Sequence, residues 1–385
     1  MFKFDFDIED AEDLDVFHPI PTATKAQGEE PIDATLVLEP FSEVPITQLL
    51  DSVPQLISYS PISISLSSTG TATTLVRRDL FDARFQLISE GAGDTAEENE
   101  DGAALDVDRK ALQFLDAPSD LVPGVYEGGL KTWECSLDVV DYLNSNPSSF
   151  VGKKVVEIGC GTGVPSMYIF REILDRIDPS GQNHEKRTEI HLQDYNASVL
   201  RLVTLPNILL TWYTSIHADP YRYTTNDSEV APTVGPKVAG ELPITPELKE
   251  AFLASLESLN ISLHFFSGSW DSFDPLKTAG PTGYDIVLSS ETIYRTESLP
   301  PLLNLMASAC TGRPTSLEGI VSSLSIEESG SSKDYLCLVA AKVLYFGVGG
   351  GVSDFVRAVE GRKGRIETVL ERTAGVGRKI MRVWW

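Results

Sequence analysis

The stretch Val155-Val156-Glu157-Ile158-Gly159-Cys160-Gly161-Thr162-Gly163 joins a mostly apolar run to a glycine-rich turn, and helical spacing begins at Val164. An apolar run flanked by charge is typical of a strand that is buried on both faces of a parallel sheet. Glycine lets the backbone turn with positive φ and lets a ligand approach closely. The stretch therefore predicts the first strand, turn and helix of a nucleotide-binding α/β sheet, in which ligands bind at the carboxyl ends of the strands.

The turn does not match the common phosphate-binding motifs. No Gly-Lys-Ser/Thr follows it, and Pro165 and Ser166 stand where a dinucleotide fingerprint has its third glycine. Glu157 is unexpected inside a buried strand, because a buried carboxylate needs a partner. The amino group of S-adenosylmethionine (AdoMet) would supply one, so we predict that Glu157, Gly159 and Gly161 bind this cofactor. The alternative is a glycine turn that serves only packing.

Strand and helix patterns alternate over residues 121–385, which predicts a parallel α/β sheet covered on both faces. The last two strands have no helix between them and predict an antiparallel hairpin. Two stretches rich in Ser, Thr, Gly and Pro, 214–246 and 311–333, are predicted to be surface insertions. A helix over Ser198–Leu210 is predicted to break at Pro206. The predicted strands are Lys154–Ile158, Ile190–Gln193, Ile261–Phe266, Asp285–Ser289, Tyr335–Ala340, Ile366–Glu371 and Ile380–Trp384.

The N-terminal part of the chain has a different composition. Residues 1–120 hold 25 acidic and 7 basic residues, whereas residues 121–385 hold 31 and 24. Its apolar runs are short, and Ala34–Leu38, Ile62–Leu66 and Phe85–Ile88 are read as strand-like segments. We therefore predict an acidic, partly disordered extension over residues 1–120 and a single α/β domain over residues 121–385.

The net charge and the number and spacing of the cysteines exclude several classes of function. The net charge of −25 argues against general binding of nucleic acid or of an anionic membrane, and it permits a basic partner. The 4 cysteines and 5 histidines show no metal-binding or disulfide spacing, so no metal site is expected. The first ten residues lack the apolar core of a secretory signal. No apolar run reaches the roughly 18 residues of a membrane helix, and a soluble intracellular monomer is expected.

Side chains with useful chemistry follow the predicted strands at their carboxyl ends. Asp194 ends the second strand, where an acid can accept both ribose hydroxyls. Trp270 and Asp271 follow the third strand and would border the adenine. Glu291 and Tyr294 follow the fourth strand, three residues apart, and would face the substrate beside the sulfonium methyl group. The alternatives are a turn acid, a core tryptophan and a helix start.

Two glycine-containing segments flank this region. In residues 124–136 (GVYEGGLKTWECS), Trp133 and Glu134 stand at a helix start from which they would close over the cofactor. Residues 345–352 (YFGVGGGV) predict either a flexible lid or a tight helix-entry turn, because so many glycines indicate special backbone angles or a close approach.

Together these segments resemble the histidine protein methyltransferase 1 family, a branch of the seven-stranded class I protein methyltransferases. The resemblance covers residues 121–385 apart from the two insertions. It implies a Rossmann-like seven-stranded sheet and AdoMet-dependent methylation of a histidine ring nitrogen in a large-subunit ribosomal protein. We expect this methylation to precede ribosome assembly, which would suit a protein found in both cytoplasm and nucleus. Its motifs are GVYEGGLKTWECS (124–136), EIGCGTG (157–163), QDYN (193–196), TLPN (204–207), FFSGSW (265–270), SETIY (290–294) and YFGVGGGV (345–352).

The resemblance also implies which residues surround the cofactor. Where the family usually has an acid, this chain has Ser269, and the neighbouring Asp271 is expected to replace it. The residues that match the family's cofactor site are Trp133, Glu134, Cys135, Ser136, Gly159, Asp194, Tyr195, Asn196, Gly268, Ser269, Trp270 and Ser290.

Histidine methylation requires orientation more than a strong base. With a pKa near 6.5 the imidazole is mostly neutral at pH 7, and a carboxylate that accepts its other N–H fixes the tautomer. We predict that Glu291 is this carboxylate and that Tyr294 shapes the pocket. Two alternatives stay open. One is a lysine methyltransferase of the same fold, which must deprotonate an ammonium with a pKa near 10.4. The other is a ribosomal-protein chaperone or assembly factor that uses the acidic extension.

Overall fold

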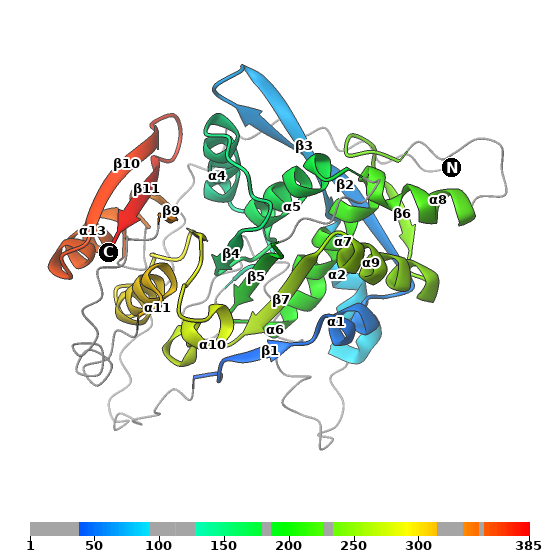
Figure 1. Cartoon of the computed structure of the whole chain (residues 1–385), viewed down its shortest axis with the longest axis horizontal. Helices are drawn as coiled ribbons and strands as arrows, with labels where there is room; N and C mark the ends of the chain where they lie inside the picture. The colour runs from blue at the N-terminus through cyan, green and yellow to red at the C-terminus, as the bar shows by residue number, and fades with distance from the viewer. Residues whose placement is uncertain are drawn as a thin grey trace, which may run out of the picture. The chain divides into compact units, whose positions relative to one another are not determined.

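An eight-stranded sheet forms the centre of the protein in this computed structural model (Figure 1). Its order is β1-β7-β5-β4-β8-β9-β11-β10, and the five strands from β7 to β9 run parallel. The structure describes residues 38–92, 112, 128–178, 186–225, 234–313, 334–345 and 350–385. The strands are β1 (Ser42–Val44), β4 (Lys154–Ile158), β5 (Thr188–Asp194), β7 (Ile261–Ser267), β8 (Ile286–Ser290), β9 (Leu336–Lys342), β10 (Arg365–Arg372) and β11 (Arg378–Trp384).

The strand order confirms the expected fold class. When the seven strands of this sheet from β4 onward, which exclude β6, are numbered along the chain, their order is 3-2-1-4-5-7-6, which is that of the seven-stranded class I methyltransferases. The last hairpin is antiparallel, because β11 pairs with β10 and with β9 in opposite directions. The strand order reverses at β4, because β5 and β7 follow on one side and β8 and β9 then follow on the other. A ligand crevice is therefore expected at the carboxyl end of β4.

The eighth strand comes from the N-terminal region. β1 pairs antiparallel with β7, with Ser42 opposite Ser267. A second sheet has the order β3-β2-β6 and is built from β2 (Leu56–Leu66), β3 (Thr71–Arg78) and β6 (Gly240–Pro243). Part of the predicted insertion at 214–246 therefore pairs with the N-terminal region. The acidic residues 1–37, the predicted boundary at residue 120 and residues 314–333 of the other insertion lie outside the described residues, so these points stay predictions.

Two local predictions are wrong. Phe85–Ile88 lies mainly in a helix, α2 (Leu80–Leu87), which turns Ala83 and Leu87 inward at helical spacing. Pro206 does not end the helix of residues 197–213. After a π-helical turn it stands in the first turn of α7 (Leu205–Tyr213), where its missing N–H is not needed.

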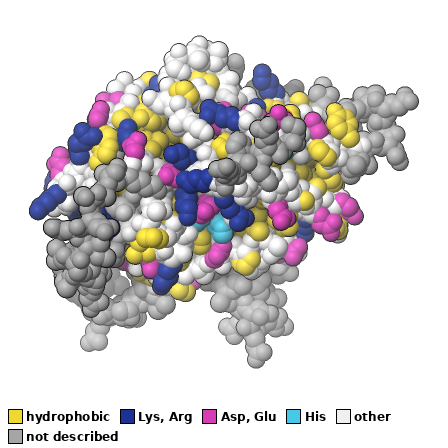
Figure 2. Space-filling view, viewed as in Figure 1, with side chains coloured by type: hydrophobic (Ala, Val, Ile, Leu, Met, Phe, Trp, Pro, Cys, Tyr) yellow, Lys and Arg dark blue, Asp and Glu magenta, His cyan; other side chains and the backbone are white. Residues whose placement is uncertain are grey.

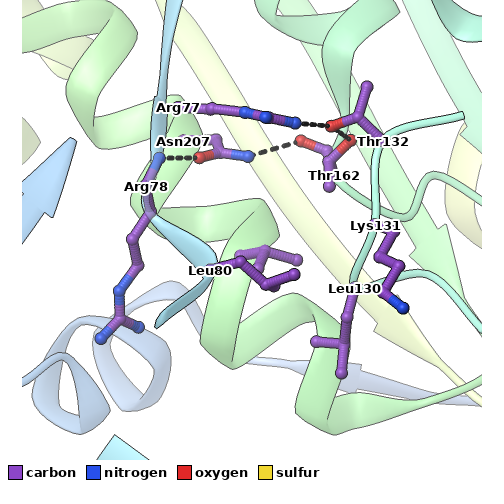
Figure 3. Close-up of a pocket in the computed structure, with 9 residues that line it drawn as sticks. Arg77, Arg78, Leu80, Leu130, Lys131, Thr132, Thr162 and Asn207 are labelled. Atoms are coloured by element: carbon purple, nitrogen blue, oxygen red, sulfur yellow. Dashed lines mark hydrogen bonds between the residues drawn. The ribbon is translucent and has the colours of Figure 1, made fainter. Parts of the chain in front are cut away.

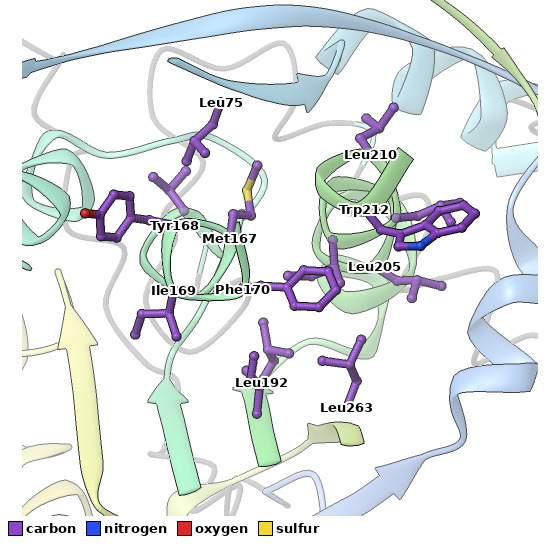
Figure 4. Close-up of a cluster of buried hydrophobic side chains, with 14 of the residues drawn as sticks. Leu75, Met167, Tyr168, Ile169, Phe170, Leu192, Leu205, Leu210, Trp212 and Leu263 are labelled. Carbon is purple, nitrogen blue, oxygen red and sulfur yellow. The ribbon is translucent and has the colours of Figure 1, made fainter. Parts of the chain in front are cut away.

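Helices cover both faces of the main sheet. Alternate strand residues point to opposite faces, so Val155 belongs to the core under α5 (Val164–Arg176) and α7, and Val156 to the core under α11 (Leu299–Thr311) and α13 (Val352–Gly361). Figure 4 shows the first of these cores, in which Phe170 and Trp212 lie above Leu192. The other helices are α1 (Ile46–Ser52), α4 (Glu134–Ser145), α5 (Val164–Arg176), α6 (Ala197–Val199), α8 (Asp219–Thr225), α9 (Pro246–Ser258), α10 (Pro275–Ala279), α11 (Leu299–Thr311) and α13 (Val352–Gly361).

Two further features concern the length of the helices and the distribution of charge on the surface. Among the described residues, no single helix is long and apolar enough to cross a membrane, although the bent pair Ala197–Tyr213 and Ile216–Tyr223 together meets the length and composition criteria. Basic and acidic side chains are interspersed on the face that Figure 2 shows. The excess of acidic residues in the sequence therefore does not make this face uniformly acidic.

Candidate active site

The glycine turn after β4 needs its glycines. Gly159, Gly161 and Gly163 have φ values of 65°, 51° and 70°, a region that other residues rarely adopt. A Cβ at Gly159 would lie 2.5 Å from Cγ2 of Thr292. The turn is therefore fixed by backbone conformation and by a close neighbour from the segment after β8.

The acid at the end of β5 binds the glycine turn. Oδ2 of Asp194 accepts the N–H of Gly161 at 2.9 Å, and Oδ1 accepts the N–H of Asn196 at 3.1 Å. Nδ2 of Asn196 donates to the carbonyl oxygen of Gly128 at 3.2 Å. Asp194, Asn196 and the turn therefore form one hydrogen-bonded corner, where the predicted ribose acid lies next to the predicted cofactor turn.

Gln193 connects three strand ends, a role that the sequence analysis missed. Its buried Oε1 accepts the N–H of Gly159 at 3.2 Å and Nε1–H of Trp270 at 2.9 Å. Its Nε2 donates to the carbonyl oxygen of Gly268 at 2.9 Å. The structure thus brings together Gly159, Gly268 and Trp270, and the only sequence signal for Gln193 was its place in the QDYN motif.

The TLPN motif holds the carbonyl groups of the same turn. Oγ1 of Thr204 donates to the carbonyl oxygen of Gly161 at 2.7 Å, and Nδ2 of Asn207 donates to that of Thr162 at 2.9 Å. Oδ1 of Asn207 accepts the backbone N–H of Arg78 in β3 at 2.8 Å. The motif therefore links the turn to the N-terminal sheet.

A cavity of about 230 Å³ lies beside this link (Figure 3). On its wall, Nη1 of Arg77 donates to Oγ1 of Thr132 at 2.9 Å, and this hydroxyl lies 3.1 Å from that of Thr162. The segment before α4, the glycine turn and β3 thus meet at one place. The cavity is lined by Arg77, Arg78, Leu80, Leu130, Lys131, Thr132, Thr162, Val203 and Asn207.

The backbone of the N-terminal segment packs on the turn after β7, where adenine is predicted to bind. The N–H of Ser269 donates to the carbonyl oxygen of Glu39 at 2.9 Å, and the N–H of Glu39 donates to the hydroxyl of Tyr195 at 3.3 Å. Oγ of Ser269 lies 3.2 Å from Oδ2 of Asp271, which is exposed. Glu39 was missed, because contacts between such distant parts of the chain leave no local sequence pattern.

Glu157 is completely buried below the turn. One carboxylate oxygen accepts both the N–H of Ser166, at 2.9 Å, and its hydroxyl. The other oxygen is buried and has no hydrogen-bond partner. Burial raises the pKa of Glu157 to about 8, and the hydrogen bonds from Ser166 oppose this shift. A buried oxygen without a partner fits the cationic amino group expected for AdoMet.

Glu291 is held by two contacts to β9 and the segment that follows it. Its backbone has a φ of 60°, and its N–H donates to the carbonyl oxygen of Ala340 at 2.9 Å. Oε2 accepts the hydroxyl of Tyr345 at 2.6 Å, while Oε1 is buried and has no hydrogen-bond partner. A non-glycine residue in this conformation stores about 1–3 kcal/mol of strain. The strand end therefore fixes a carboxylate that has one oxygen bonded to Tyr345, and the Cys135 thiol also interacts with this carboxylate.

Helix α4 begins beside this carboxylate. Nζ of Lys342 lies 3.4 Å from Oε2 of Glu134 and 4.5 Å from the ring centroid of Trp133. Burial raises the pKa of the Cys135 thiol, and the nearby Glu291 carboxylate raises it further. The structure thus brings Trp133, Glu134 and Cys135 to the ends of β8 and β9.

The remaining predicted residues line the same edge. Tyr294 is buried, and its ring centroid lies 6.3 Å from that of Tyr345. Ser290 is the last residue of β8. The hydroxyl of Ser136 donates to the carbonyl oxygen of Trp133 at 2.7 Å and so closes the first turn of α4. The candidate residues therefore form two groups, one around Gln193 and one around Glu291, along the carboxyl edge of the sheet.

Two fungal proteins with the same name are similar to this chain in sequence. The chain is 37% identical over 286 residues to histidine protein methyltransferase 1 of Saccharomyces cerevisiae, covering 73% of this chain and 67% of that protein. It is 31% identical over 348 residues to histidine protein methyltransferase 1 of Schizosaccharomyces pombe, covering 87% and 84%. No family model matches the sequence.

Solved structures are only distantly similar. The rRNA methyltransferase aviRa of Streptomyces viridochromogenes has a TM-score of 0.33 and 12% identity, over 66% of this chain and 86% of that one. The pyocyanin biosynthetic protein PhzM has a TM-score of 0.31 and 12% identity, over 64% and 55%. The fold assignment follows from the strand order of the main sheet.

Proposed function

This chain belongs to the histidine protein methyltransferase 1 family, and from that premise we propose that it transfers a methyl group from AdoMet to a ring nitrogen of a protein histidine. The chain is a methyltransferase, and its fold and family imply the use of AdoMet. The observation that carries the histidine assignment is the Glu291 carboxylate, which has one oxygen bonded to Tyr345 and one buried oxygen without a hydrogen-bond partner. Such a carboxylate is suited to accept an imidazole N–H.

The proposed cofactor contacts follow from the group around Gln193. The amino group would meet the free oxygen of Glu157, the ribose hydroxyls would meet Asp194, and the adenine would lie against Trp270. Bound AdoMet supplies an electrophilic methyl group on a sulfonium. Trp133 would close this site, because it directly precedes α4 and its ring contacts Lys342 at the end of β9.

The reaction needs a neutral imidazole that points its lone pair at the methyl group. A new N–C bond forms, the S–C bond breaks, and its electron pair stays on sulfur. Glu291 would hold the opposite ring N–H, fix the tautomer and stabilise the positive charge that develops on the ring. Tyr294 would form a wall of the pocket. Orientation of this kind lowers the barrier without a strong base.

The proposed substrate is a basic protein of the large ribosomal subunit. This choice is supported by the motif resemblance and by the net charge of −25, which favours a basic partner. Both signs of charge are interspersed on the face in Figure 2, so docking is not assigned to that face. We propose that a monomer acts before ribosome assembly, in the cytoplasm and nucleus.

Transfer of a labelled methyl group tests the proposal. The chain is incubated with methyl-labelled AdoMet and a lysate that lacks the endogenous enzyme, and the labelled protein is hydrolysed to amino acids. Methylhistidine in a basic ribosomal protein is expected. Methyl-lysine would instead support a lysine methyltransferase. No label despite AdoMet binding would favour the chaperone or assembly factor.

Substitution of Glu291 tests the mechanism in the same assay. Glu291→Gln should slow methylation and leave the affinity for AdoMet unchanged. The matched control is Glu297→Gln, because Glu297 is an exposed acid six positions away whose carboxylate contacts its neighbours Thr296 and Arg295. If the Glu291→Gln variant methylated its substrate at the full rate, the catalytic role proposed for Glu291 would be wrong.

A further inference from the structure

Tyr345 belongs to the glycine-rich segment after β9, and the sequence analysis gave it no role. Its hydroxyl lies 2.6 Å from Oε2 of Glu291 and 3.2 Å from the backbone nitrogen of Lys342. The backbone N–H can only donate, so the hydroxyl accepts from Lys342 and its single proton points to Glu291. The direction of the bond to the carboxylate is therefore fixed by geometry.

This bond determines how the carboxylate is presented. The terminal torsion of a glutamate is broad and has little preference of its own. With Oε2 bound to Tyr345, the plane of the Glu291 carboxylate is set, and the buried Oε1 is the oxygen left to accept another donor. Free rotation would let the two oxygens exchange and would present the acceptor in more than one direction.

The backbone around Tyr345 is anchored on both sides. Leu344 and Gly351 form an isolated antiparallel bridge, and the N–H of Gly350 donates to the carbonyl oxygen of Tyr294 at 3.0 Å. A Cβ at Gly350 would overlap that carbonyl group, so glycine allows the contact. The described ends of the segment are therefore tied to the Glu291 side of the site, whereas residues 346–349 lie outside the described residues.

We propose that Tyr345 is a positioning residue that determines which ring nitrogen is methylated. By holding Oε2 of Glu291, it leaves Oε1 to accept one ring N–H, so that the opposite nitrogen faces the methyl group. The two nitrogens of histidine differ in their distance from the backbone, and a fixed carboxylate selects one of them. This inference rests on the proposed function and extends it to the selectivity between the two nitrogens.

The test is Tyr345→Phe, which keeps the ring and removes the hydroxyl. We expect kcat to fall about 10- to 100-fold, as for the loss of one hydrogen bond to a charged group, with less than a twofold change in KM for AdoMet. We also expect both methylhistidine isomers, where the unchanged protein gives one. The isomer ratio is decisive, because a merely structural role would not change it.

The matched control is Tyr335→Phe. It also removes a tyrosine hydroxyl that accepts a backbone N–H, here from Trp385 at 2.7 Å, at the opposite end of β9. It should leave kcat and the isomer ratio unchanged. Glu291→Asp provides a second variant if Tyr345→Phe does not fold, because it keeps the charge but withdraws the carboxylate from Tyr345. It should also give both isomers.

The outcomes separate this inference from the proposed function. Unchanged kcat and a single isomer in Tyr345→Phe, with methylhistidine still formed, would overturn the role of Tyr345 and leave the function standing. Two isomers from the unchanged protein would also overturn it. Methyl-lysine, or no methylated product, from the unchanged protein would overturn both.

Discussion

Replacement of Gln193 by leucine should separate the assembly of the cofactor site from general stability. The side chain makes three hydrogen bonds, to the Gly159 N–H at 3.2 Å, to Nε1–H of Trp270 at 2.9 Å and to the Gly268 carbonyl oxygen at 2.9 Å. Leucine has a similar volume but leaves all three groups without this partner. At about 1–2 kcal/mol for each group, the free energy of unfolding should fall by about 3–6 kcal/mol.

The Gln193→Leu substitution should also weaken the binding of AdoMet. Without Gln193, the glycine turn and the Trp270 indole are no longer held to each other, so we expect the affinity for AdoMet to fall roughly tenfold or more, which is about 1.4 kcal/mol or more. Isothermal titration at a temperature where the variant is folded measures the affinity, and urea unfolding measures the stability.

A matched control separates the two effects. Gln86 is also buried and also bonds through both ends of its amide, to Arg78 at 2.8 Å and to Ser52 at 3.0 Å, but it lies in α2. Gln86→Leu should lose stability and keep the AdoMet affinity of the folded protein. If folded Gln193→Leu bound AdoMet as tightly as the unchanged protein, the role given to Gln193 would be refuted.

Three further substitutions test other parts of the site and core. Burial lowers the pKa of His191 from 6.5 to about 3, so the unfolded chain gains a proton first. Stability should fall as the pH drops from 6.5 toward 3, by about 5 kcal/mol at most. His191→Gln should flatten this dependence in urea unfolding. Burial raises the pKa of Glu157 from 4.5 to about 8, so its contribution is complete below pH 4.5 and is lost as the pH rises through 8. Glu157→Gln should remove that loss and weaken AdoMet binding, as titration and unfolding at several pH values would show. Gly159→Ala should abolish AdoMet binding, because its Cβ would lie 2.5 Å from Thr292. Gly375→Ala, also at positive φ but with open space around it, should cost only about 1 kcal/mol and keep binding.

The local sequence pattern was sufficient to predict the main strands and the glycine turn. Each of these features is set by neighbouring residues, since a buried parallel strand needs a short apolar run and the turn needs glycines at defined positions. The strand order depended on the family resemblance, because an apolar run does not specify its partner. The pairing of Ser42 with Ser267 brings together segments that are distant in the chain, and nothing in the local composition of β1 indicates it.

The same distinction applies to the candidate site. Asp194, Trp270 and Glu291 each follow a predicted strand, and the structure places all three along one edge of the sheet, as expected. Gln193 and Tyr345, which hold Trp270 and Glu291 in place, were marked only by their positions in the QDYN and YFGVGGGV motifs. Their importance comes from the groups they meet, which lie on other strands, and a sequence pattern records a residue type without its tertiary partner.

The two groups of the site have different demands on their surroundings. In the group around Gln193, its side-chain amide joins the backbone of Gly159 and Gly268 to the Trp270 indole, which suits a cofactor of constant shape. The group around Glu291 depends on the positive φ of Glu291 itself, just after β8. It also depends on two contacts from β9 and the segment after it, the carbonyl oxygen of Ala340 and the hydroxyl of Tyr345. A change in that segment would therefore alter the presentation of the carboxylate without disturbing Asp194 or the glycine turn. We therefore expect variants of that segment to change the selectivity for the target nitrogen and to leave the affinity for the cofactor unchanged.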